Sequence, residues 1–259
     1  MRNDEKVEFS TVRKEKKIPM REGRESGSFR HALRFQESLT STVERKILAW
    51  LAARLPAQVN SDHLTLLGFV AMFFAGASYA ATRTHRWGLI LATFFLALNW
   101  FGDSLDGTLA RLRNRQRPRY GFYVDHMIDT FGGLFLMGGL ALSGLLDWRI
   151  ALGMFVAFLM LSVQVYLATY TVGIFQLSFA KFGPTEIRIL LALGNVALWI
   201  HPNARVFGCS FQILDVGGIV AMAGMSLMLV VSTIFNTVKL YRAEPLRQAI
   251  DTKKQHSIP

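Results

Sequence analysis

The chain has 259 residues, with 29 Lys and Arg against 18 Asp and Glu, and 51% of its residues are apolar. A single cysteine excludes a fold held together by intrachain disulfides. The net charge of +11 does not indicate nucleic-acid binding, because no basic patch alternates with exposed aromatic residues. Four stretches without a charged side chain, each near or above the length of a bilayer span, exclude a soluble protein: Leu64–Thr82, Thr130–Leu146, Ile150–Ala180 and Val216–Val238.

The N-terminal part is predicted to lie outside the membrane. Residues 1–28 are polar and rich in Lys, Arg and Glu, which is typical of a disordered, basic cytoplasmic tail. In Phe29–Leu55, apolar residues recur mostly at four-residue steps, whereas Arg34, Glu37 and Glu44 lie off that stripe. The pattern predicts an amphipathic helix at the membrane interface. The alternative is a helix that packs on another cytoplasmic element.

The remaining chain is expected to be an all-α membrane domain at residues 61–241, followed by a cytoplasmic tail at residues 242–259. An even number of spans puts both termini on one side, and 25 of the 29 basic residues then flank that side. The positive-inside rule makes this side cytoplasmic, and we expect a multi-pass protein of the bacterial inner membrane. The six predicted transmembrane helices are Leu64–Thr82, Trp87–Leu112, Tyr120–Leu146, Arg149–Val172, Thr185–Ile200 and Val216–Leu240.

Four aspartates lie at the facing ends of the second and third spans: Asp103 and Asp106, then Asp125 and Asp129. A carboxylate at the centre of a span costs about 2.5–3.5 kcal/mol, so these residues need a function. Spacings of three and four residues place each pair on one helical face, and antiparallel neighbours could direct all four carboxylates into one cavity. Such oxygen ligands favour Mg²⁺ or Mn²⁺ over Ca²⁺.

Small residues and an arginine accompany these aspartates. Gly107, Ala110 and Gly121 would allow a planar or phosphate-bearing ligand to approach the backbone. Arg111 offers a planar guanidinium fork for phosphate oxygens. Together with the carboxylates, these residues predict a site for a metal-bound pyrophosphate at the cytoplasmic ends of the spans.

The run D-S-L-D-G-T-L-A-R, nine further residues and then G-F-Y-V-D-H-M-I-D resembles a known signature. It is that of the CDP-alcohol phosphotransferases, D-x2-D-G-x2-A-R-x(7–9)-G-x3-D-x3-D, and all eight fixed positions match. The resemblance implies a membrane enzyme of phospholipid synthesis, which transfers a substituted phosphate from a CDP-alcohol to an acceptor hydroxyl and releases CMP.

The resemblance also implies roles for the motif residues. Asp103, Asp106 and Asp125 would hold a Mg²⁺ or Mn²⁺ ion on the donor pyrophosphate. Asp129 would either lie beside a second ion or act as the base that takes the proton of the acceptor. The small residues Gly107 and Ala110 would face the cytidine, and Arg111 the phosphate.

Other candidates flank the motif. Thr65 closes a run similar to the Pro-Asn-x-x-Thr of relatives and either binds the nucleotide or belongs to a helix start. Glu186 and Arg188 follow a Gly-Pro-Thr segment similar to that of the choline and ethanolamine branch and are candidates for substrate binding. His126 competes with Asp129 as the base, unless the rotation of about 100° per residue turns it toward a neighbouring helix. The arginines of residues 113–119 are expected to anchor the loop on lipid.

The substrates and two alternative functions stay open at this point. The donor is either CDP-diacylglycerol with a small polar acceptor, or a CDP-amino-alcohol with diacylglycerol. Membrane lipids are expected partners, and many relatives are homodimers. An intramembrane prenyltransferase would also bind metal-pyrophosphate, but it usually begins with a contiguous Asn-Asp, whereas Asn99 is four residues from Asp103. A divalent-cation transporter would have its carboxylates near the bilayer midplane and would not need the Gly107, Ala110 and Arg111 set.

Overall fold

The computed structural model describes residues 33–35, 41–172, 174–176, 184–200, 203–206 and 209–244. The chain divides into two units, Met1–His31 and Ala32–Pro259. The first unit and the predicted tail at residues 1–28 lie outside the described residues, as does most of the predicted tail at residues 242–259.

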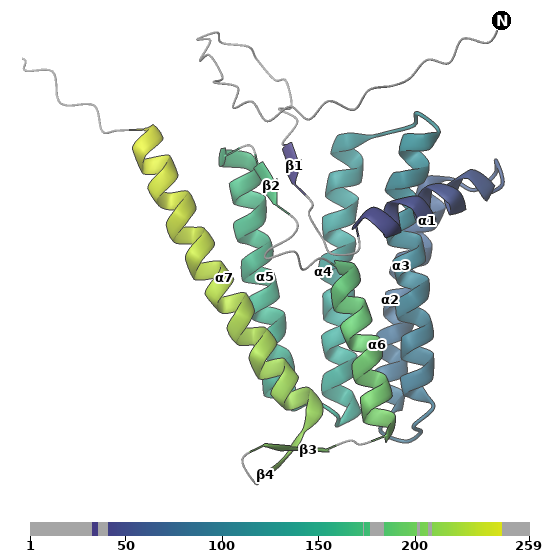
Figure 1. The fold of residues 1–259 in the computed structure, drawn as a ribbon, viewed down its shortest axis with the longest axis vertical. Coiled ribbons are helices and arrows are strands. Elements are labelled where there is room, and N and C mark those ends of the chain that lie inside the picture. The colour runs from purple at the N-terminus through teal and green to yellow at the C-terminus, as the bar shows by residue number, and fades with distance from the viewer. Residues whose placement is uncertain are drawn as a thin grey trace, which may run out of the picture. The chain divides into compact units, whose positions relative to one another are not determined.

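Helices make up almost all of the described part of the second unit (Figure 1). They are α1 (Ser41–Arg54), α2 (Ser61–Ala81), α3 (Gly88–Leu112), α4 (Pro118–Ser143), α5 (Trp148–Val172), α6 (Pro184–Ile200) and α7 (Ile213–Ala243). Helices α2–α7 coincide with the six predicted spans to within a few residues. The all-helical fold class is therefore confirmed, with two small additions. Strands β1 (Leu33–Phe35) and β2 (Ile174–Gln176) pair in parallel, and β3 (Asn203–Val206) and β4 (Cys209–Gln212) pair antiparallel.

Four of these helices, α2, α3, α5 and α7, are long and apolar enough to cross a membrane. Helix α6 has 17 residues, slightly short of a typical span. Helix α4 has sufficient length, but Asp125, His126 and Asp129 lower its hydropathy. A multi-pass membrane protein is thus supported by four helices, and the count of six spans stays a prediction.

The predicted helix at Phe29–Leu55 is wrong over its first part. Residues Leu33–Phe35 form β1, whose backbone groups pair with β2 instead of making helical hydrogen bonds, and α1 begins only at Ser41. Within α1, Leu48 and Ala52 are buried in a cluster with residues of α2 and α3, whereas Trp50 is exposed. Helix α1 therefore packs on α2 and α3, and its place at the membrane interface stays a prediction.

Small residues let α2 approach both α3 and α4. A Cβ atom on Gly102 of α3 would lie 2.5 Å from the carbonyl oxygen of Leu64 and 2.7 Å from the nitrogen of Gly68. A Cβ atom on Gly139 of α4 would lie 2.0 Å from the carbonyl oxygen of Gly76. Only glycine fits such backbone contacts. They hold α3 and α4, the two helices that carry the aspartate motif, against the same helix.

Candidate active site

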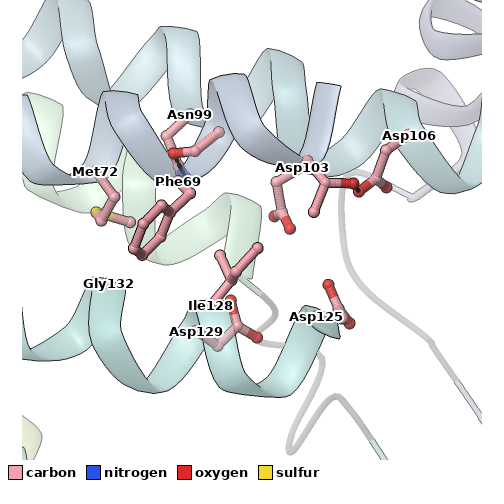
Figure 2. Close-up of a pocket in the computed structure, with 11 residues that line it drawn as sticks. Phe69, Met72, Asn99, Asp103, Asp106, Asp125, Ile128, Asp129 and Gly132 are labelled. Carbon is pink, nitrogen blue, oxygen red and sulfur yellow. Dashed lines mark hydrogen bonds between the residues drawn. The ribbon is translucent and has the colours of Figure 1, made fainter. Parts of the chain in front are cut away.

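All four aspartates of the motif line one pocket between α2, α3 and α4 (Figure 2). Asp103 and Asp106 come from α3, and Asp125 and Asp129 come from the facing side of α4. Phe69, Met72 and Ile128 form apolar parts of the wall. The structure thus brings together the carboxylates that the spacing of three and four residues placed on facing helices.

Thr65 of α2 also lines the pocket, and it contacts the motif directly. Its hydroxyl donates a hydrogen bond to Oδ2 of Asp106 at 2.6 Å. The backbone N–H of Gly107 donates to the other carboxylate oxygen of Asp106. Helix α2 already begins at Ser61, so Thr65 lies one turn inside the helix and does not cap it. These two donors fix the orientation of the Asp106 carboxylate.

Helix α6 reaches the same site through an ion pair. Arg188 Nη2 lies 2.6 Å from Oδ2 of Asp103, and the Arg188 side chain is 12% exposed. Glu186, two residues earlier, is buried at the start of α6. Of the two predicted substrate-binding residues, Arg188 is therefore in direct contact with the aspartate motif. Its guanidinium has further N–H donors that could bind a phosphate oxygen.

The predicted nucleotide-binding residues of α3 and α4 do not line this pocket in the described structure. Arg111 is exposed and donates from Nη2 to the Thr108 hydroxyl at 3.1 Å. A Cβ atom on Gly107 would lie 3.4 Å from Arg111 Nη1, so glycine leaves room beside the guanidinium. Ala110 is half-buried, and Gly121 is exposed with no atom within 4 Å of an added Cβ. These positions lie toward the ends of α3 and α4 that the loop connects.

His126 does not line the pocket, although it follows Asp125 directly and its Nδ1 lies 3.9 Å from Oδ2 of Asp125. Its ring centroid lies 4.1 Å from that of Phe122 and 4.6 Å from that of Tyr166 on α5. Its Nδ1 lies 2.6 Å from the carbonyl oxygen of Phe122. Because a carbonyl can only accept, Nδ1 carries the proton in this contact. Of the two candidate bases, Asp129 alone lines the pocket.

Two arginines of the α3–α4 loop bind protein groups, whereas the sequence suggested lipid anchoring. Arg113 donates to the carbonyl oxygens of Leu55 at 3.0 Å and Pro56 at 2.9 Å, at the end of α1. Arg117 forms an ion pair with Asp62 in the first turn of α2. The loop between the two halves of the motif is thereby tied to the segment that joins α1 to α2.

The donor set of the pocket suits a hard divalent cation, because four carboxylates offer only oxygen ligands. In the described residues, however, no three Asp, Glu, His or Cys side chains already form a group that could hold a metal ion. Asp103 is turned to Arg188 and Asp106 to Thr65. Metal binding would require carboxylates to turn toward a common point, and it stays a prediction.

Sequence reasoning missed Asn99 as part of the pocket wall. Its Nδ2 donates to the carbonyl oxygen of Gly68 at 2.9 Å, while its Oδ1 is buried and has no hydrogen-bond partner among the described residues. Asn99 lies one helical turn before Asp103, so the same four-residue spacing that grouped the aspartates could have found it.

Comparison with known proteins agrees with a helical membrane protein that has an aspartate-lined pocket. The family model for CDP-alcohol phosphatidyltransferase matches residues 59–236, which include every motif residue and Arg188. The chain therefore belongs to the CDP-alcohol phosphatidyltransferase family. This confirms the predicted class, a transferase of substituted phosphate groups in phospholipid synthesis.

Two curated relatives are similar over parts of the chain. The archaetidylinositol phosphate synthase of Methanothermobacter thermautotrophicus is 31% identical over 165 residues, which are 62% of this chain and 77% of the relative. The archaetidylinositol phosphate synthase of Pyrococcus horikoshii is 30% identical over 92 residues, which are 36% of this chain and 46% of the relative. The match thus spans less than half of the second relative's length. For this reason, the substrates of this protein are proposed below and are not taken directly from the relatives.

Proposed function

We propose that this protein transfers a lipid-bearing phosphate from a CDP-activated lipid such as CDP-diacylglycerol to the hydroxyl of a small polar acceptor, and that it releases CMP. The observation that carries the proposal is the convergence of all four motif aspartates on one pocket in a chain of this family. We further propose that α2–α7 form six spans, with the pocket at their cytoplasmic ends in the bacterial inner membrane. The excess of basic residues on that side supports this orientation.

The residues of the pocket support an in-line displacement. The acceptor oxygen forms a bond to the phosphorus that carries the lipid, while the bond from this phosphorus to the CMP oxygen breaks. CMP leaves with the electron pair, and the proton of the acceptor hydroxyl passes to Asp129. We assign this role to Asp129 because it lines the pocket, whereas His126 packs between Phe122 and Tyr166.

The other charged residues of the pocket are proposed to neutralise the charge of the reacting phosphates, directly or through a bound cation. Asp103, Asp106 and Asp125 would hold a Mg²⁺ or Mn²⁺ ion, with Asp129 beside a second ion as the alternative to its role as base. Bound there, the metal would neutralise pyrophosphate charge and the charge that develops on the leaving CMP. Arg188, held at 2.6 Å from Asp103, is placed to add a cationic group on the same side of the pocket.

The choice of donor rests on the relatives and on His126. Both relatives are named as synthases of archaetidylinositol phosphate, a product that joins a lipid to a small polar alcohol phosphate. This favours a lipid on the donor and a polyol phosphate as acceptor. The suggestion of a CDP-amino-alcohol donor depended partly on His126, whose ring faces α5 in this structure.

A donor screen tests the proposed function. Protein purified in detergent with MgCl₂ would be incubated with CDP-diacylglycerol plus inositol phosphate, glycerol phosphate or serine, and separately with CDP-ethanolamine plus diacylglycerol. We expect CMP and a lipid product of matching mass with CDP-diacylglycerol only. Asp106→Asn should remove the signal, and Asp147→Asn, at an exposed aspartate outside the pocket, should retain it.

Three outcomes would overturn parts of this proposal. Product from CDP-ethanolamine alone would reverse the choice of donor. Absence of CMP with every donor would overturn the reaction itself. Retained activity in Asp106→Asn would mean that the pocket is not the active site. An intramembrane prenyltransferase or a cation transporter would release no CMP under any of these conditions.

A further inference from the structure

Glu44 of α1 accepts hydrogen bonds from three side chains on two other helices. Its Oε1 lies 2.9 Å from Nε1 of Trp100 and 3.5 Å from Oγ of Ser104, both on α3. The same oxygen lies 2.7 Å from Oγ1 of Thr185 at the start of α6. Glu44 is half-buried, whereas Lys46, two residues later on the same helix, is exposed. This glutamate therefore joins α1 to both α3 and α6.

The contacts of Glu44 continue into the aspartate pocket. Ser104 directly follows Asp103 on α3, and Thr185 precedes Arg188 by less than one helical turn on α6. Arg188 in turn pairs with Asp103 at 2.6 Å. Glu44 thus holds the two helices together next to the point at which Arg188 meets Asp103.

Helix α6 also contacts the bundle away from its pocket end. Among the described elements it packs mainly on α3 and makes a smaller contact with α7. A further polar contact of α6 is at Asn195, which accepts from the Tyr79 hydroxyl and donates to Thr93, both at 2.9 Å. Asn195 lies seven residues, or about 10 Å of helix, beyond Arg188. Nearer the pocket, Thr185 and Arg188 make the hydrogen bonds that join the start of α6 to α1 and α3.

We propose that Glu44 is a positioning residue of the transfer reaction: it holds the start of α6 against α3 through Thr185, so that Arg188 reaches Asp103. This inference rests on the proposed function for its effect on catalysis, but its structural part can be tested separately. It makes α1 a component of the active site, although α1 lies outside the aspartate motif and before the residues that the family model matches.

Substitutions at Glu44 can distinguish the effect of its hydrogen bonds on activity from a general effect on protein stability. All three partners donate, so they need only an acceptor oxygen at this position. Glu44→Gln keeps such an oxygen and should retain most of the CMP release from CDP-diacylglycerol. Glu44→Ala removes it and should lower kcat at least about tenfold, as expected for lost hydrogen bonds to a charged group. Lys46→Ala, on the exposed side of α1, should behave as the unmodified protein.

A comparison with Arg188 tests whether Glu44 acts through that residue. If it does, Glu44→Ala combined with Arg188→Ala should be no slower than Arg188→Ala alone, because the positioned group is already absent. Losses that multiply in the double variant would overturn the proposal. Equal losses in Glu44→Gln and Glu44→Ala would also overturn it.

Hydrogen–deuterium exchange provides a measurement that is independent of activity. The peptide covering Pro184–Leu190 should exchange faster in Glu44→Ala than in Glu44→Gln or Lys46→Ala. If Glu44→Ala does not fold, Thr185→Val, which removes only the hydroxyl contact, should show the same faster exchange. Unchanged exchange would overturn the link to α6 even if CMP is released. Faster exchange in a protein that releases no CMP from any donor would retain the link and reject the proposed function.

Discussion

Replacement of Gly139 by alanine would test how closely α4 must pack on α2 for the pocket to form. The added Cβ would lie 2.0 Å from the carbonyl oxygen of Gly76 and 2.6 Å from its carbonyl carbon. Both are backbone atoms, which cannot rotate away as a side chain can. Separations under 3.0 Å are essentially never seen for Cβ atoms, so the two helices would have to move apart by at least about 1 Å here.

The cost of this movement should exceed the benefit of alanine in a helix. Overpacking a well-packed interior typically costs about 1–3 kcal/mol, while replacing glycine within a helix gains at most about 1 kcal/mol. With the full gain subtracted, the net loss is up to about 2 kcal/mol, which corresponds to a decrease in melting temperature of up to about 8 °C, at about 2–4 °C per kcal/mol for a chain of this size. The movement should also pull Asp125 and Asp129 of α4 away from Thr65 of α2, so CMP release per folded molecule should fall.

Gly138 provides a matched control for this experiment. It is the neighbouring residue on the same helix, but an added Cβ would meet no atom within 4 Å. Gly138→Ala should therefore melt at the same temperature as the unmodified protein or slightly higher. Thermal unfolding in detergent, followed by gel filtration of the remaining monodisperse protein, would compare the variants. Equal melting temperatures for Gly138→Ala and Gly139→Ala would refute the backbone contact between α2 and α4.

Three further predictions concern the chemistry. Activity should require a divalent cation, which EDTA titration would check. Asp106→Asn should lower turnover at least about a hundredfold, since metal stabilisation of charge is worth several kcal/mol. Steady-state kinetics would measure this loss. Asp129→Asn should abolish CMP release while CDP-alcohol affinity largely survives, and His126→Ala should retain release; the reverse pattern would make His126 the base. Deletion of residues 1–28 should leave activity intact because no motif residue lies there, and a folded but inactive truncation would contradict this.

The sequence was most informative where the pattern within one helix was enough to predict a feature of the structure. Long apolar stretches predicted the positions of α2–α7, because the bilayer dictates how many apolar residues a span needs. Spacings of three and four residues predicted which faces of α3 and α4 carry the aspartates. Both arguments depend on local geometry along one helix, whereas the packing of α3 and α4 depends on close contacts with α2 at Gly102 and Gly139.

Contacts between distant segments could not be predicted in this way. Glu44 and Thr185 are separated by 141 residues, and Asp103 and Arg188 by 85. No periodicity within a helix says which residue of another helix lies opposite. The neighbour of His126 could not be predicted for the same reason. A rotation of about 100° per residue gives the direction of its side chain but not the helix that lies on that side. The start of α1 was misplaced because β1 depends on pairing with β2, about 140 residues later in the chain.

If α6 crosses the membrane as proposed, its contacts fit what the bilayer allows. Lipid chains are as apolar as leucine, so apolar side chains alone give little reason for one membrane helix to choose a particular neighbour. Hydrogen bonds between helices can make that choice, because a buried polar group without a partner is costly. In α6, Asn195 bonds to Tyr79 and Thr93, and at the other end Thr185 and Arg188 bond to Glu44 and Asp103. The second set includes an aspartate of the motif, so the contacts that place α6 in the bundle also place Arg188 beside the aspartate pocket.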